Sequence, residues 1–490
     1  MTARRLMLQG TGSDVGKSVL VAGLCRVFKN RGLNVLPFKP QNMSNNAAAT
    51  AEGGEIGRAQ WLQAIAAGAE PHTDMNPVLI KPESDKGAQL VVQGKVKGPI
   101  DSGYYRTHKA ELLDMVRASY NRLCAQADLV LVEGAGSPAE VNLRAGDIAN
   151  MGFALPTKTP VVLVGDINRG GVIAAIVGTH ALLPPEEQAL VRGTIINQFR
   201  GDVSLFDGGL KAIEEQSGWA NFGVVPFLRV VRELPAEDAV VLETSERDAN
   251  GKKKVAVPML PSIANFDDLD PLAADPDIEV QFCPPGTPLP QAADLIVLPG
   301  SKSTIRDLRF LKAEGWATDI LAHARADKPV LGLCGGYQML GKLVHDPGGI
   351  EGPAGEEAGL GLLDVETVLE PVKSVQLTAA HCSALKCNVS GYEIHMGQTT
   401  LGSGAKEFIS GDGRTLGAVS ADGKIVGTYV HGLLYAGEFR ATYIKAALNL
   451  KGARVNHLDR INTNLDTVAH ALETCLDVEA LWRAAETSHE

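Results

Sequence analysis

The sequence predicts an α/β protein with two parallel-sheet domains in tandem. Its 490 residues leave room for about three compact units or two large ones, at roughly 150 residues per domain. Short apolar runs alternate with helix-length segments in both halves of the chain, and a charged stretch separates the two series. Hydrophobic residues make up 45% of the chain and charged residues 21%, which fits a globular protein and excludes a disordered or fibrous one.

Six apolar runs in the first half predict the strands of the first sheet. They are hydrophobic throughout rather than at every second position, a pattern typical of parallel strands that helices cover on both faces. The predicted strands are Leu6–Gln9, Asn34–Phe38, Leu129–Val132, Pro160–Val164, Thr194–Asn197 and Gly223–Pro226.

A polar, charged segment with the letters ETSERDANGKKK marks the boundary between the domains. We therefore expect a first domain over residues 1–240, a linker over 241–254 and a second domain over 255–490. From about Glu438 the pattern is that of a helical tail. The strands predicted in the second domain are Val255–Leu260, Ile278–Phe282, Leu295–Leu298, Val330–Leu333 and Val426–Val430.

Net charge limits the binding partners of the protein, and hydropathy and cysteine content limit its compartment. A net charge of −11 and a pI near 5.6 argue against non-specific binding to nucleic acid or to anionic membranes. The apolar runs are strand-sized, so no membrane span is predicted, and the N-terminus lacks the pattern of a signal peptide. Seven scattered cysteines suit a reducing compartment, and we expect a cytoplasmic protein.

The first motif that carries chemistry is GTGSDVGKS, which starts at residue 10 between a predicted strand and a predicted helix. A glycine-rich turn at a helix N-terminus brings several backbone N–H groups to one phosphate, here at Gly12 and Gly16. Lys17 is expected to neutralise the β and γ oxygens of ATP, and Ser18 to bind Mg²⁺. A chance glycine turn is the alternative.

Three strand ends supply further candidates for this site. Glu133 follows four apolar residues and is predicted to reach Mg²⁺ at the carboxyl edge of the sheet, the alternative being an ordinary surface acid. Asn197 is a candidate reader of the nucleobase or a capping residue. Arg169, in the loop after Asp166, is a candidate contact for phosphate or an acidic substrate, or belongs to an ordinary exposed loop.

The loop that reads KPQNMSNN from residue 39 predicts a substrate contact. Amide side chains and a cation recognise carboxylates and amides well, which favours this interpretation over a simple turn. Gln41, Asn42 and Asn45 are therefore candidate substrate-binding residues, and Asp147 is a weaker candidate for the acceptor.

In the second half, Cys334 lies in GLCGGYQ, at a strand-to-helix turn where glycines permit a strained backbone. Such a turn presents a thiol as a nucleophile, the alternative being a buried structural cysteine. His431, at the end of an apolar strand, is the predicted general base, with His395 as the competitor. The turn LPGSKST around residue 300 is expected to supply backbone N–H groups to an oxyanion.

With these motifs in place, the chain resembles the cobyric acid synthase family, the glutamine-hydrolysing amidotransferases of cobalamin biosynthesis, over nearly its whole length. KPQNMSNN is the most specific motif of the resemblance. The motifs in order are GTGSDVGKS from Gly10, KPQNMSNNA from Lys39, EGAGSPAEVNL from Glu133, GDINRGG from Gly165, NQFRGD from Asn197, NFDDLDPL from Asn265, LPGSKST from Leu298, GLCGGYQML from Gly332, GYEIHMG from Gly391 and TYVHGL from Thr428.

The resemblance implies a dethiobiotin-synthetase-like P-loop NTPase domain followed by a class I glutamine amidotransferase domain. It implies ATP-dependent amidation of the b, d, e and g carboxylates of adenosylcobyrinic acid a,c-diamide, with L-glutamine as nitrogen donor and a corrinoid as acceptor. Cys334 then forms the γ-glutamyl thioester and His431 acts as base, with Gln338 as a substrate contact and Gly300 and Gly335 at the oxyanion.

One position departs from the class I pattern, in which a Glu follows two residues after the catalytic histidine. The sequence has Leu433 there, so it does not identify the group that orients His431. Two other functions stay open: amidation of another polycarboxylate, such as the a,c positions of cobyrinic acid, and a nucleotide-switched binding ATPase. The oligomeric state is also open, with a homo-oligomer among the possibilities.

Overall fold

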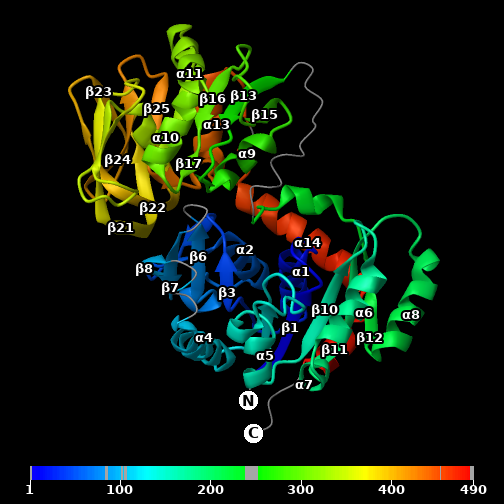
Figure 1. The fold of residues 1–490 in the computed structure, drawn as a ribbon. Helices are drawn as coiled ribbons and strands as arrows, with labels where there is room; N and C mark the ends of the chain where they lie inside the picture. The colour runs from blue at the N-terminus through cyan, green and yellow to red at the C-terminus, as the bar shows by residue number, and fades with distance from the viewer. Residues whose placement is uncertain are drawn as a thin grey trace. The chain divides into compact units, whose positions relative to one another are not determined.

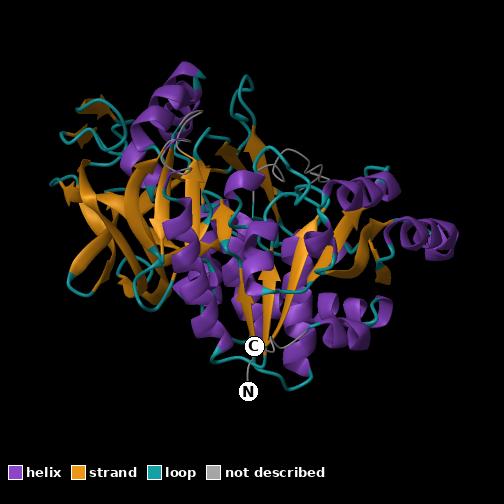
Figure 2. Cartoon of the chain, turned by 60° about the horizontal axis from the view of Figure 1, so that its bottom comes forward, coloured by secondary structure: helices purple, strands orange, loops and turns teal. Residues whose placement is uncertain are grey.

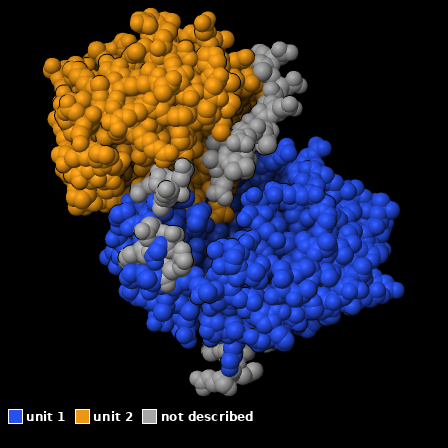
Figure 3. All heavy atoms as spheres, in the orientation of Figure 1, with its two compact units in different colours: residues 1–43, 56–234, 461–490 blue, residues 44–55, 235–460 orange. Residues whose placement is uncertain are grey.

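The structure is a computed structural model that describes residues 3–82, 87–100, 103, 107–237, 252–452 and 454–485. The chain forms two compact units, which Figure 3 distinguishes by colour. Unit 1 consists of residues 1–43, 56–234 and 461–490, and unit 2 of residues 44–55 and 235–460. Most of the expected linker, residues 241–251, lies outside the described residues.

Unit 1 is built on a six-stranded parallel sheet with the order β12-β11-β10-β1-β9-β2 (Figure 1). Every strand overlaps one of the six predicted runs, so the predicted α/β fold is confirmed here. Strands β2 and β9 lie on one side of β1, and the later strands β10 to β12 lie on the other side. Ligands of parallel sheets bind at the point where the strand order changes direction in this way, outside the carboxyl ends of the strands. The strands are β1 (Arg4–Gly10), β2 (Val35–Phe38), β9 (Leu129–Glu133), β10 (Val161–Asp166), β11 (Val191–Phe199) and β12 (Ala220–Pro226).

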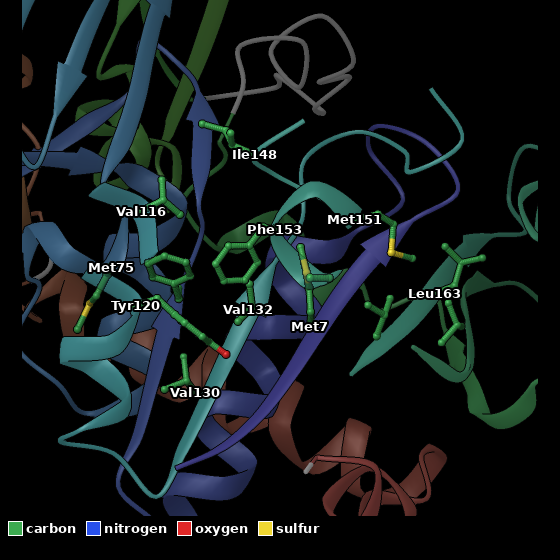
Figure 4. Packing of buried hydrophobic residues seen from close by; sticks show 14 of the residues in the cluster. Met7, Met75, Val116, Tyr120, Val130, Val132, Ile148, Met151, Phe153 and Leu163 are labelled. Atoms are coloured by element: carbon green, nitrogen blue, oxygen red, sulfur yellow. The ribbon is translucent and has the colours of Figure 1, made fainter. Parts of the chain in front are cut away.

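Helices cover both faces of this sheet, which explains the continuous hydrophobicity of its strands (Figure 2). On one face, Met7, Val130 and Val132 pack with the aromatic rings of Tyr120 and Phe153 (Figure 4). On the other face, α1 contacts the strands. The helices that build these layers are α1 (Lys17–Asn30), α4 (Lys109–Cys124), α5 (Met151–Thr157), α6 (Val172–Leu182), α8 (Asp207–Ser217) and α14 (His457–Cys475).

A second sheet of unit 1, with the order β3-β6-β7-β8, was not predicted from the sequence. Its strands are short and partly polar, and Pro82, Gly98 and Pro99 interrupt the apolar pattern. The remaining elements of the unit are β3 (Gln41–Met43), β5 (Glu55–Gly57), α2 (Arg58–Ala67), η1 (Thr73–Met75), β6 (Val78–Pro82), β7 (Ala88–Val92), β8 (Lys95–Ile100), η2 (Arg144–Gly146), α7 (Pro185–Gln188), η3 (Val203–Phe206), η4 (Arg229–Glu233) and α15 (Val478–Ala484).

The main sheet of unit 2 contains five parallel strands in the order β15-β13-β16-β18-β25, and antiparallel strands extend this sheet beyond β25. The parallel part matches the predicted runs, whereas the long β21–β22 hairpin was not predicted. The strands are β4 (Ala47–Ala49), β13 (Lys253–Pro258), β14 (Ile263–Ala264), β15 (Ile278–Cys283), β16 (Leu295–Leu298), β17 (Gly300–Ser301), β18 (Val330–Leu333), β19 (Leu343–Asp346), β20 (Gly355–Ala358), β21 (Val365–Cys382), β22 (Cys387–Leu401), β23 (Ala405–Gly411), β24 (Arg414–Ser420), β25 (Ile425–Thr428) and β26 (Val430–His431).

The helices of unit 2 surround the parallel part of its sheet. They are η6 (Phe266–Leu269), α9 (Asp270–Ala273), α10 (Thr304–Ala313), α11 (Trp316–Arg325), α12 (Gly335–Leu340), η7 (Leu433–Tyr435) and α13 (Gly437–Leu448). Among the described helices of the chain, none combines the length and the hydropathy that a membrane crossing requires.

The compact units differ from the expected domain ranges in two places. The tail from residue 461 belongs to unit 1, because α14 packs on α1 so tightly that a Cβ on Gly23 would lie 2.5 Å from Leu472 Cδ1. Residues 44–55 belong to unit 2, where the Asn46 side chain accepts a hydrogen bond from the backbone N–H of Asn265 at 2.8 Å. Both differences from the expected ranges depend on contacts between residues that are far apart in the sequence, and local sequence patterns do not reveal such contacts.

Candidate active sites

The glycine-rich loop of unit 1 lies between β1 and α1, at the carboxyl edge of the sheet, as predicted. Gly16 has a φ of 88°, a conformation that favours glycine, and α1 begins at the next residue. Lys17 is buried, and its Nζ donates to the backbone carbonyls of Gly12 at 2.9 Å and Gly136 at 3.2 Å. The loop therefore presents a cation and a helix N-terminus to the same side, an arrangement suited to phosphate.

Glu133, at the end of β9, is the centre of a buried polar cluster beside this loop. Its Oε1 accepts from Ser18 Oγ at 2.7 Å and from Lys39 Nζ at 2.9 Å. Its Oε2 accepts from Gln63 Nε2 at 2.6 Å and from Gln60 Nε2 at 3.4 Å. With only 1% of its surface exposed, Glu133 is not an ordinary surface acid, and the structure brings it together with Ser18 as the sequence predicted.

Asn197, two residues before the end of β11, holds the phosphate-binding loop in place. Its Nδ2 donates to the carbonyl of Val15 at 2.8 Å, and a Cβ on Gly16 would lie 2.3 Å from the same nitrogen. The neighbouring Gln198 donates to Asp14 O at 3.2 Å. Asn197 is thus buried beside the loop, and its contact with the nucleotide stays a prediction.

The KPQNMSNN loop is divided between the two units. Lys39 contacts Glu133 in unit 1, where Asn42 Nδ2 also donates to Gln60 Oε1 at 2.9 Å, and Gln41 lies on β3. Asn45 lies in unit 2, where its Oδ1 is buried without a hydrogen-bond partner. The structure therefore does not gather Gln41, Asn42 and Asn45 within one unit, and their contact with substrate stays a prediction.

Asp147 and Arg169 have different surroundings. Both carboxylate oxygens of Asp147 accept backbone N–H groups at the start of α5, from Ala149 at 2.7 Å and from Gly152 at 2.8 Å among others. These hydrogen bonds hold the Asp147 carboxylate at the start of α5, and its contact with the acceptor stays a prediction. Arg169 has a side chain that is 70% exposed and lies 3.6 Å from Asp14 of the phosphate-binding loop. It is the better placed of the two to meet an anionic substrate.

In unit 2, Cys334 occupies the turn between β18 and α12, as predicted. Its φ of 50° lies in the left-handed region, which is strained for a non-glycine residue and typical of a nucleophile elbow. Gly336 permits the turn, since a Cβ there would lie 2.2 Å from Leu298 O. The thiol donates to Ile394 O at 3.5 Å, and all seven cysteines of the chain are free thiols.

The ring of His431 interacts electrostatically with Cys334, and it is held by a carboxylate that sequence reasoning missed. Its Nδ1 is 2.6 Å from Asp268 Oδ2, while Asp268 Oδ1 accepts the N–H of Gly432 at 2.6 Å. Burial lowers the pKa of His431, but the charge and hydrogen bond of Asp268, together with Cys334, raise it on balance to about 10. The motif NFDDLDPL contains Asp268, although nothing in its spacing connects it with a histidine 163 residues later.

The two glycines predicted at the oxyanion lie beside this pair. A Cβ on Gly300 would lie 3.3 Å from His431 Cε1, and a Cβ on Gly335 would lie 3.0 Å from the backbone nitrogen of Ser301. Both positions are therefore closed to larger side chains unless neighbours shift. The backbone of β17 and the N-terminus of α12 approach each other next to Cys334, and their role at an oxyanion stays a prediction.

Gln338 and His395 lie further along the same site. Gln338 Nε2 donates to Met396 O at 2.9 Å and to the Tyr429 hydroxyl at 3.1 Å, so it is held in place within the unit. The ring of His395 stacks on Tyr429 with centroids 3.8 Å apart, and its Nε2 lies 3.2 Å from Glu393 Oε2. His431 interacts both with Cys334 and with the carboxylate of Asp268, which favours it over His395 as the catalytic base.

Comparisons with known proteins agree with the two kinds of domain. The family model of the CobQ/CobB/MinD/ParA nucleotide binding domain matches residues 6–241. The family model of the CobB/CobQ-like glutamine amidotransferase domain matches residues 254–439. The cobyric acid synthase of Brucella suis is 56% identical over 99% of this chain and 100% of the relative. That of Rhizorhabdus wittichii is 56% identical over 98% of this chain and 99% of the relative.

Among solved structures, a glutamine amidotransferase covers 40% of this chain and 99% of that chain, at 16% identity and a TM-score of 0.31, too low to support an argument. The fold, the two sites and the family models define a glutamine-dependent amidoligase, in which a nucleotide-binding domain precedes a glutamine amidotransferase domain. The chain belongs to the cobyric acid synthase family of cobalamin biosynthesis, as the resemblance indicated.

Proposed function

We propose that the enzyme amidates the b, d, e and g carboxylates of adenosylcobyrinic acid a,c-diamide and thereby forms adenosylcobyric acid. ATP is the energy source, and L-glutamine supplies the nitrogen. The observation that carries the proposal is the presence of both a thiol–imidazole pair and a phosphate-binding loop in a chain 56% identical to cobyric acid synthases over its full length.

The nitrogen is released in unit 2. The sulfur of Cys334 attacks the side-chain amide carbon of glutamine, and backbone N–H groups near Gly300 and Gly335 stabilise the oxyanion. His431 donates a proton to the departing nitrogen, the carbon–nitrogen bond breaks, and ammonia leaves a γ-glutamyl thioester. His431 then takes a proton from water, which hydrolyses the thioester to glutamate and restores the thiol.

The acid is activated in unit 1. A carboxylate of the corrinoid attacks the γ-phosphorus of ATP, giving an acyl phosphate and ADP. Lys17 and the N-terminus of α1 offset the charge on the transferred phosphoryl group. Ammonia from unit 2 then attacks the acyl carbon and phosphate departs, which leaves the amide. Lys39, Asn42 and Arg169 are the proposed contacts of the acceptor, and Asn197 of the nucleotide.

Ser18 and Glu133 fit a magnesium ion that accompanies ATP. Mg²⁺ prefers oxygen ligands and is usually held by one or two carboxylates together with substrate phosphates. The Ser18 hydroxyl and the Glu133 carboxylate meet at 2.7 Å beside the loop and supply this donor set. When bound, the ion would draw electron density from the phosphate oxygens, while Ser18 and Glu133 fix its position.

Two variants separate the half-reactions. Cys334→Ala is expected to lose glutamine-driven synthesis and to keep synthesis from ammonium salts, because the acid is still activated. Lys17→Ala is expected to lose synthesis from both nitrogen sources while it still hydrolyses glutamine. Product mass spectrometry should show amidation of four acids. Full glutamine-driven activity in Cys334→Ala, or a different acceptor for the wild-type enzyme, would overturn the proposal.

A further inference from the structure

We propose that Asp268 is the positioning residue of the glutaminase: it orients His431 and holds it as the cationic partner of Cys334. The inference rests on the proposed glutamine hydrolysis and adds a residue that the class I sequence pattern does not locate. Leu433 occupies the position two residues after His431 where that pattern has a glutamate. Leu433 is fully buried and apolar, so it provides no acceptor for the imidazole.

The geometry of Asp268 meets the requirements for orienting an imidazole. One oxygen accepts from His431 Nδ1 at 2.6 Å, which directs the opposite nitrogen, Nε2, away from Asp268 and leaves it for Cys334. The other oxygen accepts the N–H of Gly432 at 2.6 Å, so one carboxylate fixes both the ring and the backbone turn that follows it. Gly432 has a φ of 72°, and the turn is therefore one that glycine favours.

The surroundings of the pair exclude solvent. The side chains of His431 and Asp268 are 3% and 1% exposed, so their interaction is little screened by water. Tyr392 stacks on the His431 ring with centroids 5.4 Å apart. Among the described residues, Asp268 binds the His431 ring through a hydrogen bond, Tyr392 stacks on it, and Cys334 acts on it electrostatically. Asp268 is the carboxylic acid of this group.

The turn that carries Asp268 is itself braced. Asn265, at a φ of 54°, donates from Nδ2 to Ala47 O at 2.8 Å and to the Tyr392 hydroxyl at 2.7 Å. Its carbonyl accepts the N–H of Asp268 at 3.1 Å. Asp268 therefore reaches His431 from a rigid support, which a positioning residue requires.

The chemical consequence concerns both steps of glutamine hydrolysis. An imidazolium beside the sulfur favours the thiolate, the form that attacks an amide carbon. The same imidazolium supplies the proton for departing ammonia, and Asp268 stabilises the positive charge whenever His431 is protonated. Neutralising Asp268 should therefore lower the rate of the chemical step more than it weakens glutamine binding.

The test compares Asp268→Asn with a matched control, Asp267→Asn, in the full-length enzyme. Asp267 is the adjacent buried carboxylate, and it accepts from the Tyr435 hydroxyl at 3.2 Å. We expect Asp268→Asn to lower kcat for glutamine hydrolysis by about 100-fold or more with a small change in KM. Synthesis from ammonium salts should persist, and Asp267→Asn should keep most of its glutaminase activity.

Alkylation of Cys334 by iodoacetamide, followed by peptide mass spectrometry, reads the ionisation of the thiol directly. Its pH midpoint should rise in Asp268→Asn and stay unchanged in Asp267→Asn. If Asp268→Asn does not fold, proton NMR of the wild-type enzyme decides: a strongly downfield imidazole proton that disappears in His431→Gln supports the proposal, and its absence overturns it.

The possible failures are distinguishable. A wild-type enzyme that hydrolyses no glutamine contradicts the proposed function. A wild-type enzyme that does hydrolyse it, paired with an Asp268→Asn variant of unchanged kcat and unchanged alkylation midpoint, contradicts only the role of Asp268.

Discussion

Neutralising Glu133 tests the nucleotide site most sharply, because this carboxylate joins the phosphate-binding loop to the KPQNMSNN loop. Its contacts are Ser18 on the first loop, Lys39 on the second, and the amide of Gln63. We expect Glu133→Gln to lose ATP-dependent amidation with glutamine and with ammonium salts alike. Glutamine hydrolysis should persist, since Cys334 and His431 belong to the other compact unit.

The size of the structural cost follows from burial. The side chains of Lys39 and Glu133 are 6% and 1% exposed, so removing the carboxylate breaks a buried ion pair. Breaking a buried ion pair in this way costs about 3–5 kcal/mol. Because glutamine retains one oxygen acceptor, we expect the loss of stability to lie at the lower end of this range for Glu133→Gln and at the upper end for Glu133→Ala. Either value is a large share of the roughly 5–15 kcal/mol by which domains are stable.

The assay combines urea unfolding with initial rates for both nitrogen sources. Glu140→Gln is the matched control, because it neutralises an exposed acid on the loop after β9. It should change stability by less than about 0.5 kcal/mol and leave both rates intact. Wild-type amidation by a folded Glu133→Gln variant would show that Glu133 is not needed at the nucleotide site, and an unchanged urea midpoint would show that its ion pair does not stabilise the fold.

Three further results are expected. Asn46→Ala should lower glutamine-driven synthesis more than ammonium-driven synthesis, since Asn46 holds the turn of Asn265; rates with both nitrogen sources measure this. The pKa of His431 is raised from 6.5 to about 10, so protonation of His431 contributes fully to stability below about pH 6.5, and this contribution is lost as the pH rises through 10. Urea unfolding of the wild-type enzyme should therefore show a lower stability at about pH 9.5 than at pH 7, and His431→Gln should lack this decline. Arg414→Ala should lower the thermal midpoint, because it removes the two-pronged partner of the fully buried Glu393 carboxylate, at 2.8 and 3.1 Å.

Local patterns were enough to predict the parallel sheets and the nucleophile turn. Strands such as β9 and β10 are buried on both faces, so their hydrophobicity is continuous and visible in the sequence. Cys334 was predictable because its strained turn requires flanking glycines. These signals arise within a few residues, where sequence and conformation are directly linked.

The remaining features depend on contacts between distant residues. Asp268 meets His431 across 163 positions, and Lys39 meets Glu133 across 94. The division of the KPQNMSNN loop between two compact units was likewise invisible, because the loop reads as one polar segment until Asn46 is seen to hold Asn265. A polar side chain in a sequence shows what it can bind, and the fold determines what it meets.

The most direct test of the two-site account is the stoichiometry of the purified full-length enzyme with the corrinoid. Glutamine hydrolysed, ATP cleaved and amides formed should be measured in one reaction mixture. We expect one glutamine and one ATP to be consumed for every amide formed. Amide formation without ATP cleavage, or with glutamine left intact in the absence of added ammonium, would contradict it.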